Sequence, residues 1–177
     1  MYYPNRNNNR HPFHDYSQPC TYFITLNVRL GRYLFGKVTS SATIELTPLG
    51  KTTAKYWLEI PEHFENVRLD KMIVMPNHLH GIIHIGINPP LLTKHQSTPK
   101  QPNHFGPLPK GSLGVIIGQF KASVTRWANQ NSIGGLFSWQ PRYYDRIITN
   151  PKDLWKYRIY IQQNPEKWWL KYGEQTW

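Results

Sequence analysis

Two histidines separated by one residue are the side chains in this sequence best suited by type and spacing to chemistry. His78 and His80 follow Pro76-Asn77, which predicts a tight turn, so both should lie on the strand that leaves that turn. Residues two apart on a strand point to the same face, and Leu79 points to the other. Two neighbouring imidazoles on one strand form half of a site for a divalent metal ion. An isolated pair of this kind also arises by chance.

A tyrosine and an asparagine near the end of the sequence supply a second chemical feature. Tyr160 and Asn164 are four residues apart in a predicted helix, so they share one flank of it. That flank lies beside a packing stripe made of Leu154, Tyr157 and Ile161. If this helix lies over the histidine strand, a metal half-site, an amide oxygen and a phenolic nucleophile converge. Position alone favours an ordinary surface tyrosine for Tyr160.

Three residues compete for these roles. His84 has the same strand parity as His80, but four residues along a strand span about 13 Å. We therefore expect His84 to contact DNA or to be a hydrogen-bonded surface histidine, and not to be a third ligand. Tyr143 and Tyr144 are rival nucleophiles, but they precede the predicted helix and are expected to pack or to bind DNA.

The charge balance favours a phosphate-rich partner. The chain has 21 Lys and Arg against 10 Asp and Glu, a net charge of +11, and 14% aromatic residues that could stack on unpaired bases. No acidic residue lies between Asp70 and Asp145, a block that holds the histidine pair. The candidate DNA contacts are Lys121, Arg126, Arg142 and Arg146. The alternative for each of them is plain surface charge.

Composition excludes several classes of protein. No apolar run approaches the roughly 20 residues of a membrane span, and the first residues lack the apolar core of a secretory signal. One cysteine, Cys20, excludes an internal disulfide framework and a cysteine-based zinc knuckle. We expect a cytoplasmic protein with no membrane partner.

The order of the predicted elements indicates the fold. We expect strands at about 22–28, 69–75, 78–87 and 143–148, a short strand or hairpin at 32–38, and helices at about 47–60, 113–127 and 150–163. Thr47-Pro48 and Asn150-Pro151 start helices, while Pro61 and Asn164-Pro165 should end them. The first six main elements follow the β-α-β-β-α-β pattern of an α+β ferredoxin-like sandwich, with an antiparallel sheet. The last helix is then free to cover the exposed face of the sheet.

The length of the chain predicts one domain over residues 20–177. Residues 1–19 are rich in Asn, Pro, His and Arg and are expected to form a mobile basic arm. Residues 88–110 hold six prolines and are expected to form a long exposed loop.

Four stretches together resemble a known family. They are 46–50 (Leu-Thr-Pro-Leu-Gly), 74–83 (Val-Met-Pro-Asn-His-Leu-His-Gly-Ile-Ile), 120–125 (Phe-Lys-Ala-Ser-Val-Thr) and 139–145 (Trp-Gln-Pro-Arg-Tyr-Tyr-Asp) leading into 160–165 (Tyr-Ile-Gln-Gln-Asn-Pro). In this order they resemble the HUH single-tyrosine transposases, and most of all the REP-associated tyrosine transposases. The resemblance covers most of residues 20–170, leaving out the arm and the proline-rich loop.

The resemblance assigns roles to the candidate residues. His78 and His80 match the paired metal-binding histidines, and Tyr160 matches the nucleophile. Asn164 matches the amide that completes the metal site in this branch. Other branches have a glutamine there, so the neighbouring Gln163 is the alternative third ligand. The expected metal is Mg²⁺ or Mn²⁺.

The resemblance also implies an activity. The protein would cut single-stranded, hairpin-bearing DNA, form a 5′-phosphotyrosine and pass the strand to a second 3′-OH, acting as a monomer or a homodimer. One alternative is a non-catalytic nucleic-acid-binding module that has kept the fold. Another is a metal-dependent nuclease that uses activated water.

Overall fold

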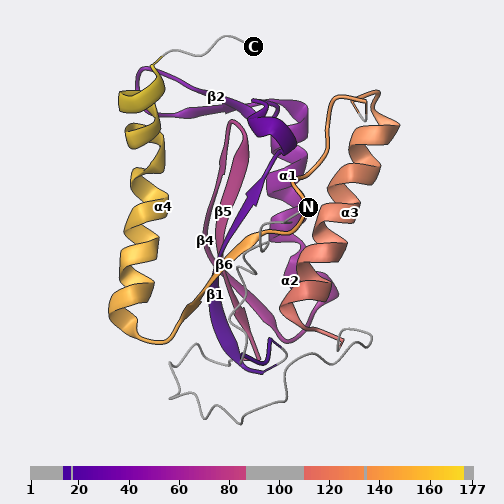
Figure 1. The fold of residues 1–177 in the computed structure, drawn as a ribbon, viewed down its shortest axis with the longest axis vertical. Coiled ribbons are helices and arrows are strands. Elements are labelled where there is room, and N and C mark those ends of the chain that lie inside the picture. The colour runs from indigo at the N-terminus through magenta and orange to yellow at the C-terminus, as the bar shows by residue number, and fades with distance from the viewer. Residues whose placement is uncertain (1–13, 17, 87–109, 134, 174–177) are drawn as a thin grey trace, which may run out of the picture.

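The protein is a layered α+β structure with its main sheet between a layer of helices on one side and a single long helix on the other (Figure 1). The computed structural model describes residues 14–16, 18–86, 110–133 and 135–173. Four antiparallel strands make the sheet in the order β4 (Val67–Met75), β5 (His78–Ile85), β1 (Cys20–Asn27) and β6 (Tyr144–Ile148). The predicted fold class is therefore confirmed.

One face of the sheet is covered by α1 (Pro48–Leu58), α2 (Ile60–His63) and α3 (Leu113–Gln130) (Figure 1). These helices and the strands enclose the main apolar core. The Thr47 side chain caps α1 by accepting from the backbone N–H of Gly50 at 3.0 Å, as its place before Pro48 predicts. α1 ends at Leu58, close to the predicted end at about Ile60, but Pro61 does not stop it, because Pro61 lies in the first turn of the short helix α2 that follows, where its missing N–H is not needed.

The opposite face of the sheet is covered by one helix, α4 (Pro151–Tyr172) (Figure 1). The Asn150 side chain caps it by accepting from the N–H of Asp153 at 2.8 Å. The predicted end at Gln163 was wrong, because α4 continues through Pro165 for two more turns. Beyond the proline, Trp168 is buried against Val38 and Met75. This packing supports the last turns, although Pro165 removes one helical hydrogen bond.

A small second sheet supports the end of α4. The strand or hairpin predicted at 32–38 is β2 (Gly36–Val38), which pairs antiparallel with β3 (Ile44–Leu46). A single 3-10 turn, η1 (Arg29–Gly31), connects β1 to this region. Val38 of β2 belongs to the apolar cluster that holds Trp168.

Two predicted segments fall mainly outside the described residues. Residues 1–13 and 17 of the expected arm are not described, nor are residues 88–109 of the expected proline-rich loop. The last part of the arm packs on the body, where His14 is hydrogen-bonded to the Tyr22 hydroxyl at 2.8 Å and Tyr16 stacks on the same ring. None of the helices in the described ranges is apolar and long enough to span a membrane.

Candidate active site

The histidine pair lies on β5 and faces α4. The hairpin between β4 and β5 sets Met75 opposite His78, and the next strand sets Thr25 opposite His80. The two imidazoles meet through their outer nitrogens, with His78 Nε2 3.0 Å from His80 Nε2. As strand alternation predicts, Leu79 is buried in the main core on the other face.

Neighbouring side chains hold the inner nitrogens of the pair. The Asn77 amide donates to the Gly31 carbonyl at 3.1 Å, so its oxygen faces His78 Nδ1 at 2.7 Å. That oxygen only accepts, so His78 carries its proton on Nδ1 and its Nε2 lone pair is free for a ligand. Thr25 Oγ1 lies 2.9 Å from His80 Nδ1 and can accept from it in the same way. Partners of this kind fix the tautomer of metal-binding histidines.

Burial keeps both histidines neutral. It lowers the pKa of His78 to about 4. It lowers the pKa of His80 to about 3, with a further lowering by the neighbouring His78. Metal ions bind the neutral imidazole, so at neutral pH both rings are in the form that binding requires.

The spacing of the pair suits one metal ion. Two nitrogens that each bind an ion at about 2.1 Å and at right angles lie about 3.0 Å apart, which matches the distance between the two Nε2 atoms. The described residues contain no group of three or more His, Cys, Asp or Glu that could hold a metal. Further ligands would therefore have to be an amide, water or the substrate.

Tyr160 reaches this pair from α4. Its hydroxyl lies 3.5 Å from His80 Nε2, a contact rather than a strong hydrogen bond. Its ring makes edge contacts with His80 and Phe23, and 39% of the residue is exposed. The phenol therefore combines access from solvent with a fixed position beside the candidate metal ligands.

Asn164 lies on the same side of α4. It is one turn after Tyr160, which contacts His80, and one turn before Trp168, whose ring lies 5.6 Å from that of His78. Asn164 is only 7% exposed, whereas Gln163 is exposed. Of the two amides that the sequence offers, Asn164 is the one on the face that packs against the histidine strand.

The rival tyrosines have other contacts. The Tyr144 hydroxyl accepts a hydrogen bond from Arg146 Nε, and Tyr143 packs against the main core.

His84 is hydrogen-bonded, as expected, but it is buried and does not lie on the surface. His84 is 3% exposed and hydrogen-bonded to Thr21 Oγ1 at 2.7 Å and Asp70 Oδ2 at 3.3 Å. Asp70 also accepts from Arg158 on α4, with Nε to Oδ1 at 3.0 Å. This network ties the tyrosine helix to β4. The sequence signal for it was a single acid, Asp70, inside a predicted strand.

The four candidate DNA contacts are distributed over both faces of the sheet. Lys121 and Arg126 lie on α3, across the sheet from Tyr160 (Figure 1). Lys121 Nζ donates to the carbonyls of Gln140 and Arg142 at 2.9 and 3.0 Å, and burial lowers its pKa. Arg146 pairs opposite Phe23 on β6, so it shares the sheet face of Tyr160.

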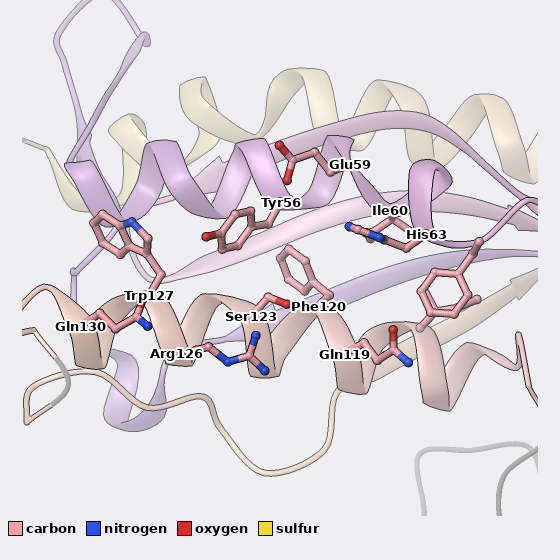
Figure 2. A pocket seen from close by; sticks show the side chains of 12 residues that line it. Tyr56, Glu59, Ile60, His63, Gln119, Phe120, Ser123, Arg126, Trp127 and Gln130 are labelled. Carbon is pink, nitrogen blue, oxygen red and sulfur yellow. The ribbon is translucent and has the colours of Figure 1, made fainter.

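Arg126 lines a groove between α1–α2 and α3, with a cavity of about 340 Å³ (Figure 2). Trp127 and Gln130 of α3 and Tyr56 and His63 on the opposite wall also line it. The groove is separated from the histidine pair by the sheet. Arg142 is exposed in the turn before β6 with a left-handed φ of 65°.

Known proteins include a sequence relative of this chain and a protein of similar fold. No family model matches the chain. An uncharacterised protein of Haemophilus influenzae is 35% identical over 162 residues, which cover 88% of this chain and 85% of the relative. A solved structure of a REP-associated tyrosine transposase bound to a REP hairpin matches with a TM-score of 0.57 and 19% identity, over 89% of this chain and 74% of that one. The chain therefore belongs to the family of the Haemophilus influenzae protein and has the fold seen in the REP-associated tyrosine transposase.

Proposed function

We propose that the protein cuts and rejoins single-stranded DNA with Tyr160 as its nucleophile. One observation carries this proposal: the Tyr160 hydroxyl lies 3.5 Å from His80 Nε2, which itself lies 3.0 Å from His78 Nε2. The fold likeness adds support, because the matched transposase was solved with a REP hairpin. We extend hairpin-bearing DNA to this chain as the proposed substrate.

In the proposed reaction the Tyr160 oxygen attacks the phosphorus of a DNA phosphodiester. A bond forms between that oxygen and phosphorus, and the bond from phosphorus to the 3′ oxygen breaks. The phenol gives up its proton to solvent, which the partly exposed side chain can reach, and the leaving oxygen takes up a proton to become a 3′-OH. The products are a 5′-phosphotyrosine and a free 3′ end.

His78 and His80 would hold a divalent ion, with Asn164 as the amide ligand and Mg²⁺ or Mn²⁺ as the proposed metal. Such an ion would polarise a non-bridging phosphate oxygen and offset the charge that develops during attack. Mg²⁺ prefers oxygen ligands, so two imidazoles alone bind it weakly and the substrate phosphate should complete the site. Asn77 and Thr25 would keep the two rings in the required tautomer and orientation.

The phosphotyrosine retains the free energy of the broken bond. A second 3′-OH can attack the same phosphorus, release Tyr160 and join a new strand without ATP. Arg158 and Tyr157 would hold α4 in place meanwhile, through the Asp70 carboxylate and the stacked ring of Phe23.

The test uses purified protein with Mn²⁺ or Mg²⁺ and end-labelled hairpin oligonucleotides from the DNA beside its own gene. Denaturing gels would show whether the label on the 3′ side of the cut migrates with the protein. We expect an adduct that is lost in Tyr160→Phe and in His78→Ala. Tyr157→Phe is the matched control, because it removes a hydroxyl from the same helix while keeping the ring stacked on Phe23.

Two results would contradict the proposal. Binding without an adduct across these substrates would indicate a non-catalytic nucleic-acid-binding module. Cleavage without an adduct would indicate that water is the nucleophile.

A further inference from the structure

The flank of α4 that carries Tyr160 also carries a row of exposed lysines. At about 100° per residue, Lys156, Lys167 and Lys171 lie within about 40° of Tyr160 on the helix surface. All three lysines are exposed. The Lys167 ammonium lies 5.8 Å from the centre of the Tyr160 ring, which places it directly beside the candidate nucleophile. We call these three residues the lysine stripe.

The acids of α4 lie outside the stripe. Glu166 is about 120° from Tyr160 around the helix. Asp153 lies on the same flank but in the first turn, before the stripe begins, and its carboxylate accepts a hydrogen bond from the Asn150 amide at 2.7 Å. From Lys156 to Lys171 the flank is therefore purely cationic around Tyr160, over a length of about 22 Å.

Contacts on the other flank show which way the stripe faces. Arg158 and Gln162 contact Asp70 and Lys71 of β4, one edge strand of the sheet. The stripe lies on the side of α4 turned away from that edge. On the side of β6, the opposite edge strand, Arg146 lies on the same sheet face as α4. Figure 1 shows the sheet on only one side of α4.

We infer that single-stranded DNA runs along the lysine stripe, with phosphates bound on both sides of the phosphate that Tyr160 attacks. This inference rests on the proposed function and identifies the surface that holds its substrate. Lys156 is one turn before Tyr160, and Lys167 and Lys171 are two and three turns after it, so the strand crosses the nucleophile between them. Charge complementarity selects a polyanion, and the length of the stripe suits a few nucleotides.

A strand held on both sides has a consequence for rejoining. After cleavage, one part of the DNA is bound covalently to Tyr160 and the other ends in a free 3′-OH. Lysines on both sides keep the second part from diffusing away, so that its 3′-OH can attack the phosphotyrosine again. The stripe would thus favour rejoining over release of a broken strand.

The first arm of the test measures binding in a Tyr160→Phe background, so that it does not depend on cleavage. Affinity for a labelled single-stranded oligonucleotide is measured from 50 to 200 mM salt. Each phosphate contact to a single strand contributes about 0.7 to the slope of log K against log salt. We expect Lys156→Ala, Lys167→Ala and Lys171→Ala each to lower the slope by about this amount, and the triple variant to lower it by about 2.

Lys51→Ala is the matched control. Lys51 is an exposed lysine on α1, across the sheet, and its replacement removes the same charge. The inference is overturned if the stripe variants change the slope no more than Lys51→Ala does. Thermal melts of each variant confirm that the exposed substitutions leave the fold intact.

The second arm locates the lysines along the DNA. Single phosphates of the oligonucleotide are replaced by neutral methylphosphonates, and each replacement is combined with each lysine variant in a double-mutant cycle. We expect Lys156 to couple to a phosphate on one side of the cut and Lys167 to one on the other. Coupling of both lysines to the same side would overturn the two-sided arrangement. If the protein with Tyr160 formed no adduct but the stripe variants still lowered the salt slope, the proposed function would be contradicted and the inferred binding surface would stand.

Discussion

The two faces of the sheet differ in what they bury. The face under α1 and α3 has a continuous apolar core, which includes Leu79, Ile83 and Ile85 of β5. The face under α4 has two smaller apolar clusters, and it also carries the buried His80 and His84 and the half-buried Asp70. A single strand contributes to both, because its side chains alternate between the faces.

This difference separates the source of stability from the source of chemistry. Apolar burial stabilises the fold roughly in proportion to area, whereas buried polar groups cost free energy unless they are paired. The α4 face carries His78 and His80, whose pKa values are lowered because burial disfavours the charged form of each ring. On the same strand, substitutions that face α1 and α3 should therefore lower stability, whereas substitutions that face α4 should impair metal binding.

The largest expected contrast is between adjacent residues of β5. Leu79→Ala should lower the free energy of unfolding by about 3 kcal/mol, because it leaves a cavity in the main core. His80→Ala should change stability little but abolish Mn²⁺ binding. Urea denaturation and isothermal titration with Mn²⁺ measure the two effects. If His80→Ala destabilised the fold as much as Leu79→Ala, the histidine pair would be structural.

A second contrast concerns the glycine that follows His80. A Cβ on Gly81 would lie 2.3 Å from Cζ2 of Trp57, so the indole of α1 packs directly on the strand backbone. Gly81→Ala should destabilise by about 2 kcal/mol through overpacking, measured by urea denaturation.

Two further variants test that explanation. Trp57→Phe removes the atoms that the new Cβ meets, so the double variant should lose less than the sum of the two single changes. Gly118→Ala on α3 is the control, because its Cβ meets nothing within 4 Å. It should stabilise by about 0.5–1 kcal/mol. Additive effects of Gly81→Ala and Trp57→Phe would contradict the proposed clash.

Features set by local sequence could be predicted. The helix starts at Thr47 and Asn150 depend on one side chain and a following proline, and the hydrogen bonds are those expected. The shared face of His78 and His80 depends only on strand periodicity, and their outer nitrogens do meet. The contact of Tyr160 with the histidine pair could be predicted only if α4 was assumed to pack over the histidine strand.

Features set by packing between distant segments could not be predicted. The continuation of α4 past Pro165 depends on Trp168 packing against β2, about 130 residues earlier in the sequence. The hydrogen bond between Asp70 and His84 joins β4 to β5. It could not be predicted by counting alternate residues along the strands, because the pairing register shifts between Leu69 and Met72. Thr25 became a partner of His80 only through the pairing of β1 with β5.

Two threonines on β1 allow a sharper test of the α4 face. Thr25 Oγ1 contacts His80 Nδ1, and Thr21 Oγ1 makes the equivalent contact with His84. Thr25→Val should weaken Mn²⁺ binding at least about 10-fold, because it removes the group that orients a ligand. Thr21→Val removes the same kind of hydroxyl and should leave the affinity unchanged. If isothermal titration showed that Thr25→Val and Thr21→Val change the Mn²⁺ affinity equally, β1 would influence metal binding only through general packing.

The smallest expected effect is a pH-dependent one at Asp70. Burial acts to raise the pKa of this carboxyl, but hydrogen bonds from Arg158 and the N–H of Lys71, and the Arg158 charge, lower it below its usual value. Stability from the ionised form is therefore present above the unfolded pKa of about 3.9 and is lost as pH falls through the folded pKa. Because Arg158 is partly exposed, Asp70→Asn should cost only about 1 kcal/mol at pH 7. His84, which also faces Asp70, has its pKa lowered by burial and stays neutral at pH 7.

The measurement is a series of thermal melts from pH 7 to pH 2. The stability difference between the wild type and Asp70→Asn should vanish in the most acidic samples, while the difference between the wild type and Lys71→Ala should persist. A constant difference down to pH 2 would show that the Asp70 charge does not hold α4 to the sheet.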